Sequence, residues 1–159
     1  MSKPASARSR WSVWKLALCC AVLTAACGSK ETVEQQIIGV INEMEQSAEA
    51  GERGEFMDRV AADFSGQEGE VTRDQLNALI LYQLNRHRRV QVQLFPIMVK
   101  PDGPDRAVAN MHVLLTGGPK RLPDRGRMYD VSSRWQLRDG DWLLVGARWK
   151  PVALDSVLE

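Results

Sequence analysis

Residues 129–149 read YDVSSRWQLRDGDWLLVGARW: apolar and polar side chains alternate before a central Asp139-Gly140 pair, and a largely apolar run follows it. A period of two is typical of β-strands, and Asp-Gly favours the tight turn of a β-hairpin. The stretch therefore predicts two antiparallel strands, at 129–137 and 142–149, joined by a two-residue turn.

The same alternation continues upstream of this hairpin. Residues 90–95 alternate, Pro101-Asp102-Gly103-Pro104 supplies turn residues, and residues 107–115 form a further candidate strand. A turn centred on Asp102-Gly103 would place six apolar side chains on one face, which we expect to meet the helices. The expected pairs are Leu94–Met111, Val92–Val113 and Val90–Leu115.

Before residue 90 the apolar residues recur at helical spacing instead. Gly residues and a capping-box sequence mark the ends of the segments. The pattern predicts three helices: a long one from Ser29 or Thr32 to Ala50, a short one through Phe56, Val60 and Phe64 to Gly66, and a third from the capping box Thr72–Gln75 to about Arg88.

Three helices followed by an antiparallel meander predict an α+β domain whose helices pack on one face of a curved antiparallel β-sheet. This order resembles the nuclear transport factor 2-like superfamily, the cone-shaped fold shared with ketosteroid isomerase and small polyketide cyclases. The resemblance covers roughly residues 31–152 and rests on the element order, on Asp63-Phe64 and on Asp139-Gly140-Asp141-Trp142. It implies a pocket at the open end of the cone, but it does not imply one activity.

The first 26 residues have the composition of an export signal. Four basic residues and no acidic residue precede a short apolar run at 16–26, which is too short to span a bilayer. The run ends in Leu23-Thr-Ala-Ala-Cys27, which resembles the lipobox of bacterial lipoproteins. That resemblance implies cleavage before Cys27 and attachment of acyl chains such as palmitate to this cysteine.

A lipidated Cys27 sets the expected domain boundaries and the location. Residues 1–26 form the signal peptide, 27–32 a lipidated tether, 33–152 the folded domain and 153–159 a tail. An Asp directly after the cysteine resembles the signal that retains lipoproteins in the inner membrane. The residues after Cys27 do not include this Asp. We therefore expect an anchor in the periplasmic leaflet of the outer membrane. The alternative is an ordinary secretory signal with an incidental cysteine.

Removal of residues 1–26 from 159 leaves 133 residues with 17 basic and 20 acidic side chains. Acidic residues outnumber basic ones 12 to 4 from Lys30 to Asp74, and basic residues outnumber acidic ones 13 to 8 from Gln75 onward. One interpretation is that the basic half contacts anionic headgroups or an acidic partner. The alternative is that it forms a set of solvated faces. We expect no nucleic-acid partner in the periplasm.

The register of the second hairpin predicts which side chains face the pocket. A two-residue turn pairs Leu137 with Trp142 and Trp135 with Leu144, and the same parity pairs Ser133–Gly146, Val131–Arg148 and Tyr129–Lys150. The apolar face then also carries three polar residues, Tyr129, Ser133 and Arg148, which we expect to bind a ligand with an anionic or carbonyl group. The alternative is a structural group, in which Arg148 satisfies the buried Tyr129 hydroxyl or neutralises Asp58 or Asp63. Trp149 is expected on the outer face, where it would support a homodimer.

Catalytic and metal-binding patterns are weak. His112 is expected on the outer sheet face and His87 at a helix C-terminus, and no carboxylate joins them at metal-ligand spacing. No cofactor or metal is expected. Ketosteroid isomerase-like proteins use a carboxylate beside an apolar cavity, but Asp58, Asp63 and Asp130 do not match that family's positions.

Two classes of function remain. The favoured one is a non-catalytic lipoprotein that binds a small apolar or lipid ligand, or an envelope protein. The alternative is an isomerase, dehydratase or cyclase that uses the pocket.

Overall fold

The computed structural model describes residues 31–86, 90–117 and 125–152. The predicted signal peptide, Cys27, His87, Arg88 and the predicted tail 153–159 lie outside these described residues. The helices are α2 (Val33–Ala50), α3 (Arg53–Asp58) and α4 (Arg73–Arg86), and a 3₁₀ turn spans Gln67–Gly69. The strands are β1 (Val60–Gly66), β2 (Val71–Thr72), β3 (Val90–Pro101), β4 (Arg106–Gly117), β5 (Arg125–Arg138) and β6 (Asp141–Val152).

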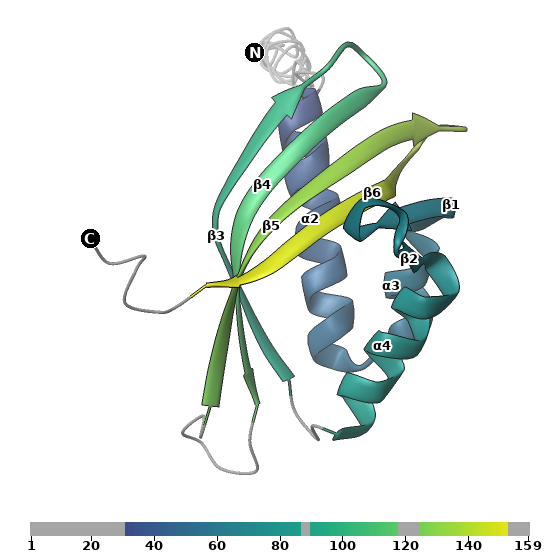
Figure 1. The fold of residues 1–159 in the computed structure, drawn as a ribbon. Coiled ribbons are helices and arrows are strands. Elements are labelled where there is room, and N and C mark those ends of the chain that lie inside the picture. Colours follow the sequence, from purple (N-terminus) through teal and green to yellow (C-terminus); the bar gives the residue numbers. More distant parts are fainter. Residues whose placement is uncertain (1–30, 87–89, 118–124, 153–159) are drawn as a thin grey trace, which may run out of the picture. The chain divides into compact units, whose positions relative to one another are not determined.

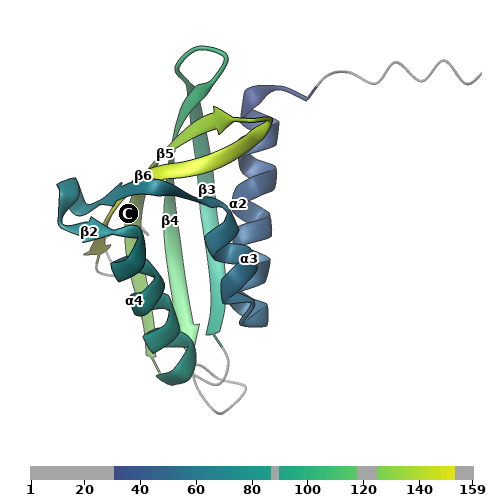
Figure 2. The same ribbon diagram turned by 90° about the vertical axis from the view of Figure 1, so that its right-hand side faces the viewer.

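The strands form one curved sheet in the order β2-β1-β6-β5-β4-β3. Neighbouring strands are antiparallel except β1 and β6, which are parallel. Both views show α2 and α4 on the same face of this sheet (Figures 1 and 2). The expected α+β class is therefore confirmed. Within the described ranges, no helix has the length and apolar character needed to cross a membrane.

The ends of the long helices form as the sequence predicts. Thr32 caps α2 through a capping box in which the Gln35 backbone N–H donates to Thr32 Oγ1, and Gly51 ends the helix with a φ of 77°. The second predicted box is also present, because Thr72 N–H donates to Gln75 Oε1 at 2.8 Å and Gln75 N–H donates to Thr72 Oγ1 at 3.3 Å. Local capping thus fixes where both helices start.

The predicted second helix is wrong beyond Asp58. Helix α3 ends there, and Val60–Gly66 is a strand that pairs with β6. Val60 and Phe64 are both buried, so their spacing of four residues imitated a helix. The register shifts between Val60 and Ser65, which explains why the strand lacks clean alternation. Asp63 therefore lies in a strand, where it forms an ion pair with Arg138 that holds the pKa of the Asp63 carboxyl below its usual range.

The core lies between the helices and the concave face of the sheet. Trp135 and Trp142 are 3% and 4% exposed, which confirms both as core residues. Ile37, Ile41 and Met44 of α2 pack into the same cluster. Because α2 buries this apolar stripe against the sheet, it forms a fixed wall on which a site can be built.

The second hairpin follows the predicted register only near its turn. Asp139 and Gly140 have φ values of 52° and 92°, as a type I′ turn requires, and Leu137–Trp142 and Trp135–Leu144 pair as expected. A bulge then adds one residue to β6, so Arg134 pairs with Gly146. The predicted pairs Ser133–Gly146, Val131–Arg148 and Tyr129–Lys150 are wrong, and the observed pairs are Ser133–Ala147, Val131–Trp149 and Tyr129–Pro151.

The first hairpin differs from its predicted register by three residues next to the turn and by two beyond a bulge. Pro101 pairs with Ala107, which leaves a five-residue loop, and a bulge follows between Phe95 and Met98. Leu94 consequently pairs with Val113 and not with Met111. Beyond the bulge, the shift of two residues keeps Val92, Leu94 and Val113 on their predicted face, which is directed at the helices.

Candidate ligand-binding pocket

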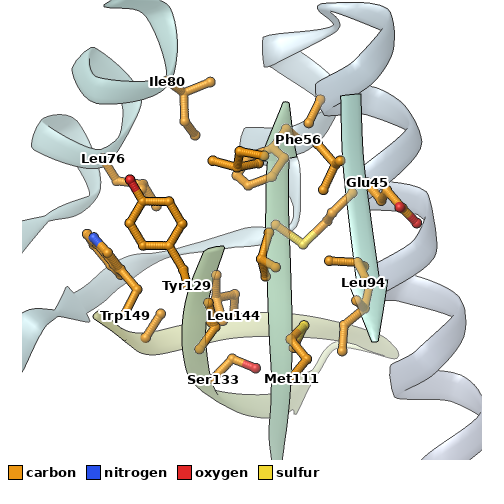
Figure 3. Close-up of a pocket in the computed structure, with 18 of the residues that line it drawn as sticks. Glu45, Phe56, Leu76, Ile80, Leu94, Met111, Tyr129, Ser133, Leu144 and Trp149 are labelled. Atoms are coloured by element: carbon orange, nitrogen blue, oxygen red, sulfur yellow. The ribbon is translucent and has the colours of Figure 1, made fainter. Parts of the chain in front are cut away.

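An apolar pocket of about 430 Å³ lies between the helices and the concave face of the sheet. Figure 3 shows Leu76 and Ile80 of α4 on one side, Phe56 of α3 above, and Leu94, Met111 and Leu144 of the sheet opposite. A volume of this size falls within the range of small-molecule sites. The pocket is therefore large enough to hold an organic molecule of drug size.

The pocket exists because α4 does not close onto the central strands. Helix α4 packs mainly against β1, α3 and β2, at one edge of the sheet. Its apolar side chains at Leu76, Leu79, Ile80 and Leu84 face the pocket, at the spacing of one helix face. Leu79 remains 41% exposed, so these side chains do not bury one another fully. The site is thus an unfilled part of the apolar layer.

Arg148 is not in this pocket, contrary to the sequence prediction. The bulge in β6 moves Arg148 to the other face, where its side chain is 66% exposed and Nη1 lies 2.9 Å from Glu68 Oε1. The same bulge brings Trp149 and Ala147 to the pocket. The prediction that Trp149 lies on the outer face is therefore also wrong, and Trp149 no longer supports a dimer contact there.

Gly146 lies beside this bulge, where the backbone of β1 and the Arg134 side chain come close to β6. A Cβ at position 146 would lie 2.9 Å from the backbone oxygen of Ser65 and would overlap the Arg134 guanidinium. Only glycine allows β1 and the Arg134 side chain to approach β6 this closely. The sequence contained this signal as a glycine within a strand pattern, but the parity argument did not use it.

Trp149 is held in place from the β1 side. Gln67 pairs with its backbone like a strand residue: Nε2 donates to Trp149 O at 2.9 Å, and Oε1 accepts from Trp149 N at 3.2 Å. Gly66 gives the indole room, because a Cβ there would lie 3.3 Å from Trp149 Cζ3. Gln67 has a φ of 48°, a left-handed conformation that costs a non-glycine residue energy. The two hydrogen bonds offset that cost and fix one wall of the pocket.

Ser133 lines the pocket, as the sequence predicts, but its hydroxyl is already engaged. Ser133 Oγ donates to Ala109 O at 3.1 Å and accepts from Trp135 Nε1 at 2.9 Å. Ser133 is 3% exposed. Its main role is to satisfy the buried Trp135 N–H and to tie β5 to β4.

Tyr129 also lines the pocket, and Figure 3 shows its hydroxyl directed toward α4 near Leu76. Among the described residues, no side chain or backbone group forms a hydrogen bond with this hydroxyl. The structure thus brings Tyr129 and Ser133 to the site and leaves Arg148 outside it. Of these three residues, Tyr129 alone brings an unused hydrogen-bonding group to the pocket, because the Ser133 hydroxyl is occupied; the Gln83 amide of α4 also lines the pocket.

Glu45 is a pocket residue that the sequence reasoning missed. It lies on α2, and partial burial, followed by the nearby Glu49 charge, raises the pKa of its carboxyl. Figure 3 shows the carboxylate directed away from Tyr129. The two groups therefore do not converge on one point in the cavity. The position of Glu45 on the apolar side of α2, between Ile41 and Ala48, was the signal that could have identified it.

His112 lies outside the pocket, with its ring centroid 6.4 Å from that of Phe95. It pairs with Phe95 and with Asp130 across the sheet, so the predicted partner Gln93 is wrong by two residues. Its Nδ1 is buried without a hydrogen-bond partner among the described residues. In the same part of the chain, no group of His, Cys, Asp and Glu side chains is arranged to hold a metal ion.

No protein-family model matches the chain, and no curated protein matches its sequence. Solved structures do share its fold. A proposed dehydratase of the NTF2-like family from Streptomyces avermitilis has 15% identity and a TM-score of 0.65 over 76% of this chain and 96% of its own. An NTF2-like protein of unknown function from Pseudomonas putida has 17% identity and a TM-score of 0.62 over 77% and 89%.

A third NTF2-like protein, from Cytophaga hutchinsonii, has 12% identity and a TM-score of 0.60 over 77% of this chain and all of its own. Identities this low establish the fold and not the activity. The chain therefore has the nuclear transport factor 2-like α+β fold.

Proposed function

We propose that the protein is a lipid-anchored binding module of the cell envelope that holds a small apolar molecule in the pocket between α4 and the sheet. The pocket carries this proposal, because about 430 Å³ of space is lined mostly by aliphatic and aromatic side chains. An apolar ligand would bury its own surface and that of Leu76, Leu79 and Ile80, at roughly 25 cal/mol per Å² of apolar area.

Binding is favoured over catalysis by the placement of the polar groups. An isomerase or dehydratase needs an acid or base within hydrogen-bond reach of the reacting atoms. Glu45 is the lining carboxylate, and its charge is directed away from the cavity centre. Ser133 is occupied by Ala109 and Trp135. Apart from the Tyr129 hydroxyl and the Gln83 amide, the other lining side chains are aliphatic, aromatic or methionine, which supports binding and not proton transfer.

A pocket-filling substitution tests the ligand site. Ala48 lines the pocket from α2, whereas Ala50 lies exposed on the same helix outside it. We expect naphthalene, titrated calorimetrically into the detergent-solubilised full-length protein, to bind the wild type and Ala50→Trp. We expect Ala48→Trp to lose this binding, because the indole occupies the same space. Equal binding by all three proteins would place the probe elsewhere and contradict the proposal.

The membrane anchor is proposed from the sequence around Cys27. Cys27→Ser is expected to release the protein from membranes or to leave it unprocessed. The substitution removes the thiol that would be acylated, and stable anchoring needs more than one acyl chain. Fractionation and mass spectrometry of the wild type and the variant measure this. If the variant stays with membranes at mature size and the wild type carries no lipid, the anchor is wrong.

The proposed location is the periplasmic leaflet of the outer membrane. There the pocket could take up lipid-derived or other apolar molecules, and an envelope protein is the alternative partner. Separation of inner and outer membranes on a sucrose gradient tests the location. Recovery of the lipidated protein with the inner membrane would contradict it.

A further inference from the structure

We propose that the pocket selects neutral apolar molecules that carry a hydrogen-bond acceptor, such as a ketone carbonyl, and that the Tyr129 hydroxyl donates to this acceptor. This inference rests on the proposed function and deepens it, because it names the chemical class of the ligand. Of the anionic or carbonyl group expected from the sequence, it keeps the carbonyl and drops the anionic group, which depended on Arg148.

The first step concerns the hydrogen-bonding capacity of the walls. Tyr129 is half-buried, lines the cavity and has no partner for its hydroxyl among the described residues. A phenol O–H both donates and accepts. A polar group that loses water on ligand binding costs free energy unless the ligand supplies a partner. A bound molecule with an acceptor near Leu76 would supply that partner.

The second step concerns charge. The cavity wall formed by the described residues contains no Lys, Arg or His side chain, and Arg148 is paired with Glu68 on the opposite face. The acidic residue on the wall is Glu45, and partial burial already raises the pKa of its carboxyl. An anionic ligand would lose its hydration without gaining a cation, and it would also be repelled by Glu45. The pocket therefore disfavours carboxylates and phosphates.

The third step concerns rigidity, because one hydrogen bond selects ligands only if its donor is held in place. Tyr129 lies on β5, which is paired with β4 on one side and β6 on the other. Trp149 lies diagonally across from it on β6 and is fixed by the Gln67 hydrogen bonds. The phenol and the indole thus form adjoining walls, a shape suited to a flat or chain-like apolar ligand.

Three compounds of similar size separate these effects: 2-acetylnaphthalene carries a carbonyl, 2-ethylnaphthalene has no acceptor, and 2-naphthoate is anionic. Each is titrated calorimetrically into the full-length protein in detergent, with the heat of a micelle-only titration subtracted. Affinities are compared between wild type and Tyr129→Phe, so that partition into micelles cancels. Tyr82→Phe is the matched control, because Tyr82 is 55% exposed on α4 and does not line the pocket.

We expect Tyr129→Phe to weaken 2-acetylnaphthalene about fivefold, the equivalent of one hydrogen bond, and to leave 2-ethylnaphthalene unchanged. Tyr82→Phe should change neither, and 2-naphthoate should bind most weakly to every protein. If Tyr129→Phe binds each neutral compound as tightly as wild type does, or if 2-naphthoate binds most tightly of the three compounds, this inference is overturned. The proposed function would then still stand. Failure of wild type to bind either neutral compound would instead overturn the proposed function.

Discussion

Trp135→Ala is expected to lower the free energy of unfolding by about 3–5 kcal/mol, the usual cost of removing a large buried aromatic side chain. Trp135 is 3% exposed, packs in the central cluster, and donates its indole N–H to Ser133. The substitution removes these contacts and leaves a cavity that the neighbouring strands cannot fill. Urea unfolding followed by far-ultraviolet circular dichroism measures the loss.

Trp149→Ala is the control for this prediction. Both side chains line the pocket, but Trp149 is half-buried whereas Trp135 is 3% exposed, so removal of Trp149 loses fewer buried contacts. We expect a clearly smaller loss of stability than for Trp135→Ala. Equal losses for the two variants would mean that both side chains are core residues, and the description of the pocket wall would be wrong.

Gly146→Ala is expected to destabilise the protein by about 1–3 kcal/mol, the range for overpacking at a tight site. The added Cβ would lie 2.9 Å from Ser65 O and would push β1 or Arg134 away from β6. Because the bulge at this position turns Trp149 toward the pocket, the variant should also weaken naphthalene binding. Urea unfolding and calorimetric titration measure the two effects.

Gly39→Ala provides a control with the opposite sign. Gly39 is an exposed residue within α2, and a Cβ there meets no atom within 4 Å. Glycine in a helix interior is less stable than alanine by roughly 0.5–1 kcal/mol, so this variant should be stabilised. A stabilising or neutral Gly146→Ala would show that the close approach of β1 to β6 does not depend on glycine.

Local signals in the sequence predicted most of the fold. The two capping boxes, Gly51 and the Asp139-Gly140 turn act within a few residues, and each forms as expected. The prediction failed at 60–66, where strand formation depends on pairing with β6, some 80 positions further along the chain. Residue spacing alone could not distinguish a buried irregular strand from a helix, because both place Val60 and Phe64 inside.

The site was also predicted only in part, because local sequence determines some of its residues and tertiary structure determines the others. Tyr129 and Ser133 lie on a strand without a bulge at these positions, so their parity held. Arg148 and Trp149 exchanged faces because one extra residue at the bulge reverses every side chain beyond it. Glu45 was missed because the extent of the cavity depends on how α4 sits over the sheet, a tertiary feature that the sequence pattern does not contain.

The central claim is that a small apolar molecule binds between α4 and the concave face of the sheet. Nuclear Overhauser contacts between naphthalene and the methyl groups of the full-length protein test it most directly. The account predicts contacts to Ile80, Val113 and Leu144, which line the pocket from α4, β4 and β6. Contacts confined to Leu81 and Met98, which are exposed and do not line the pocket, would contradict it.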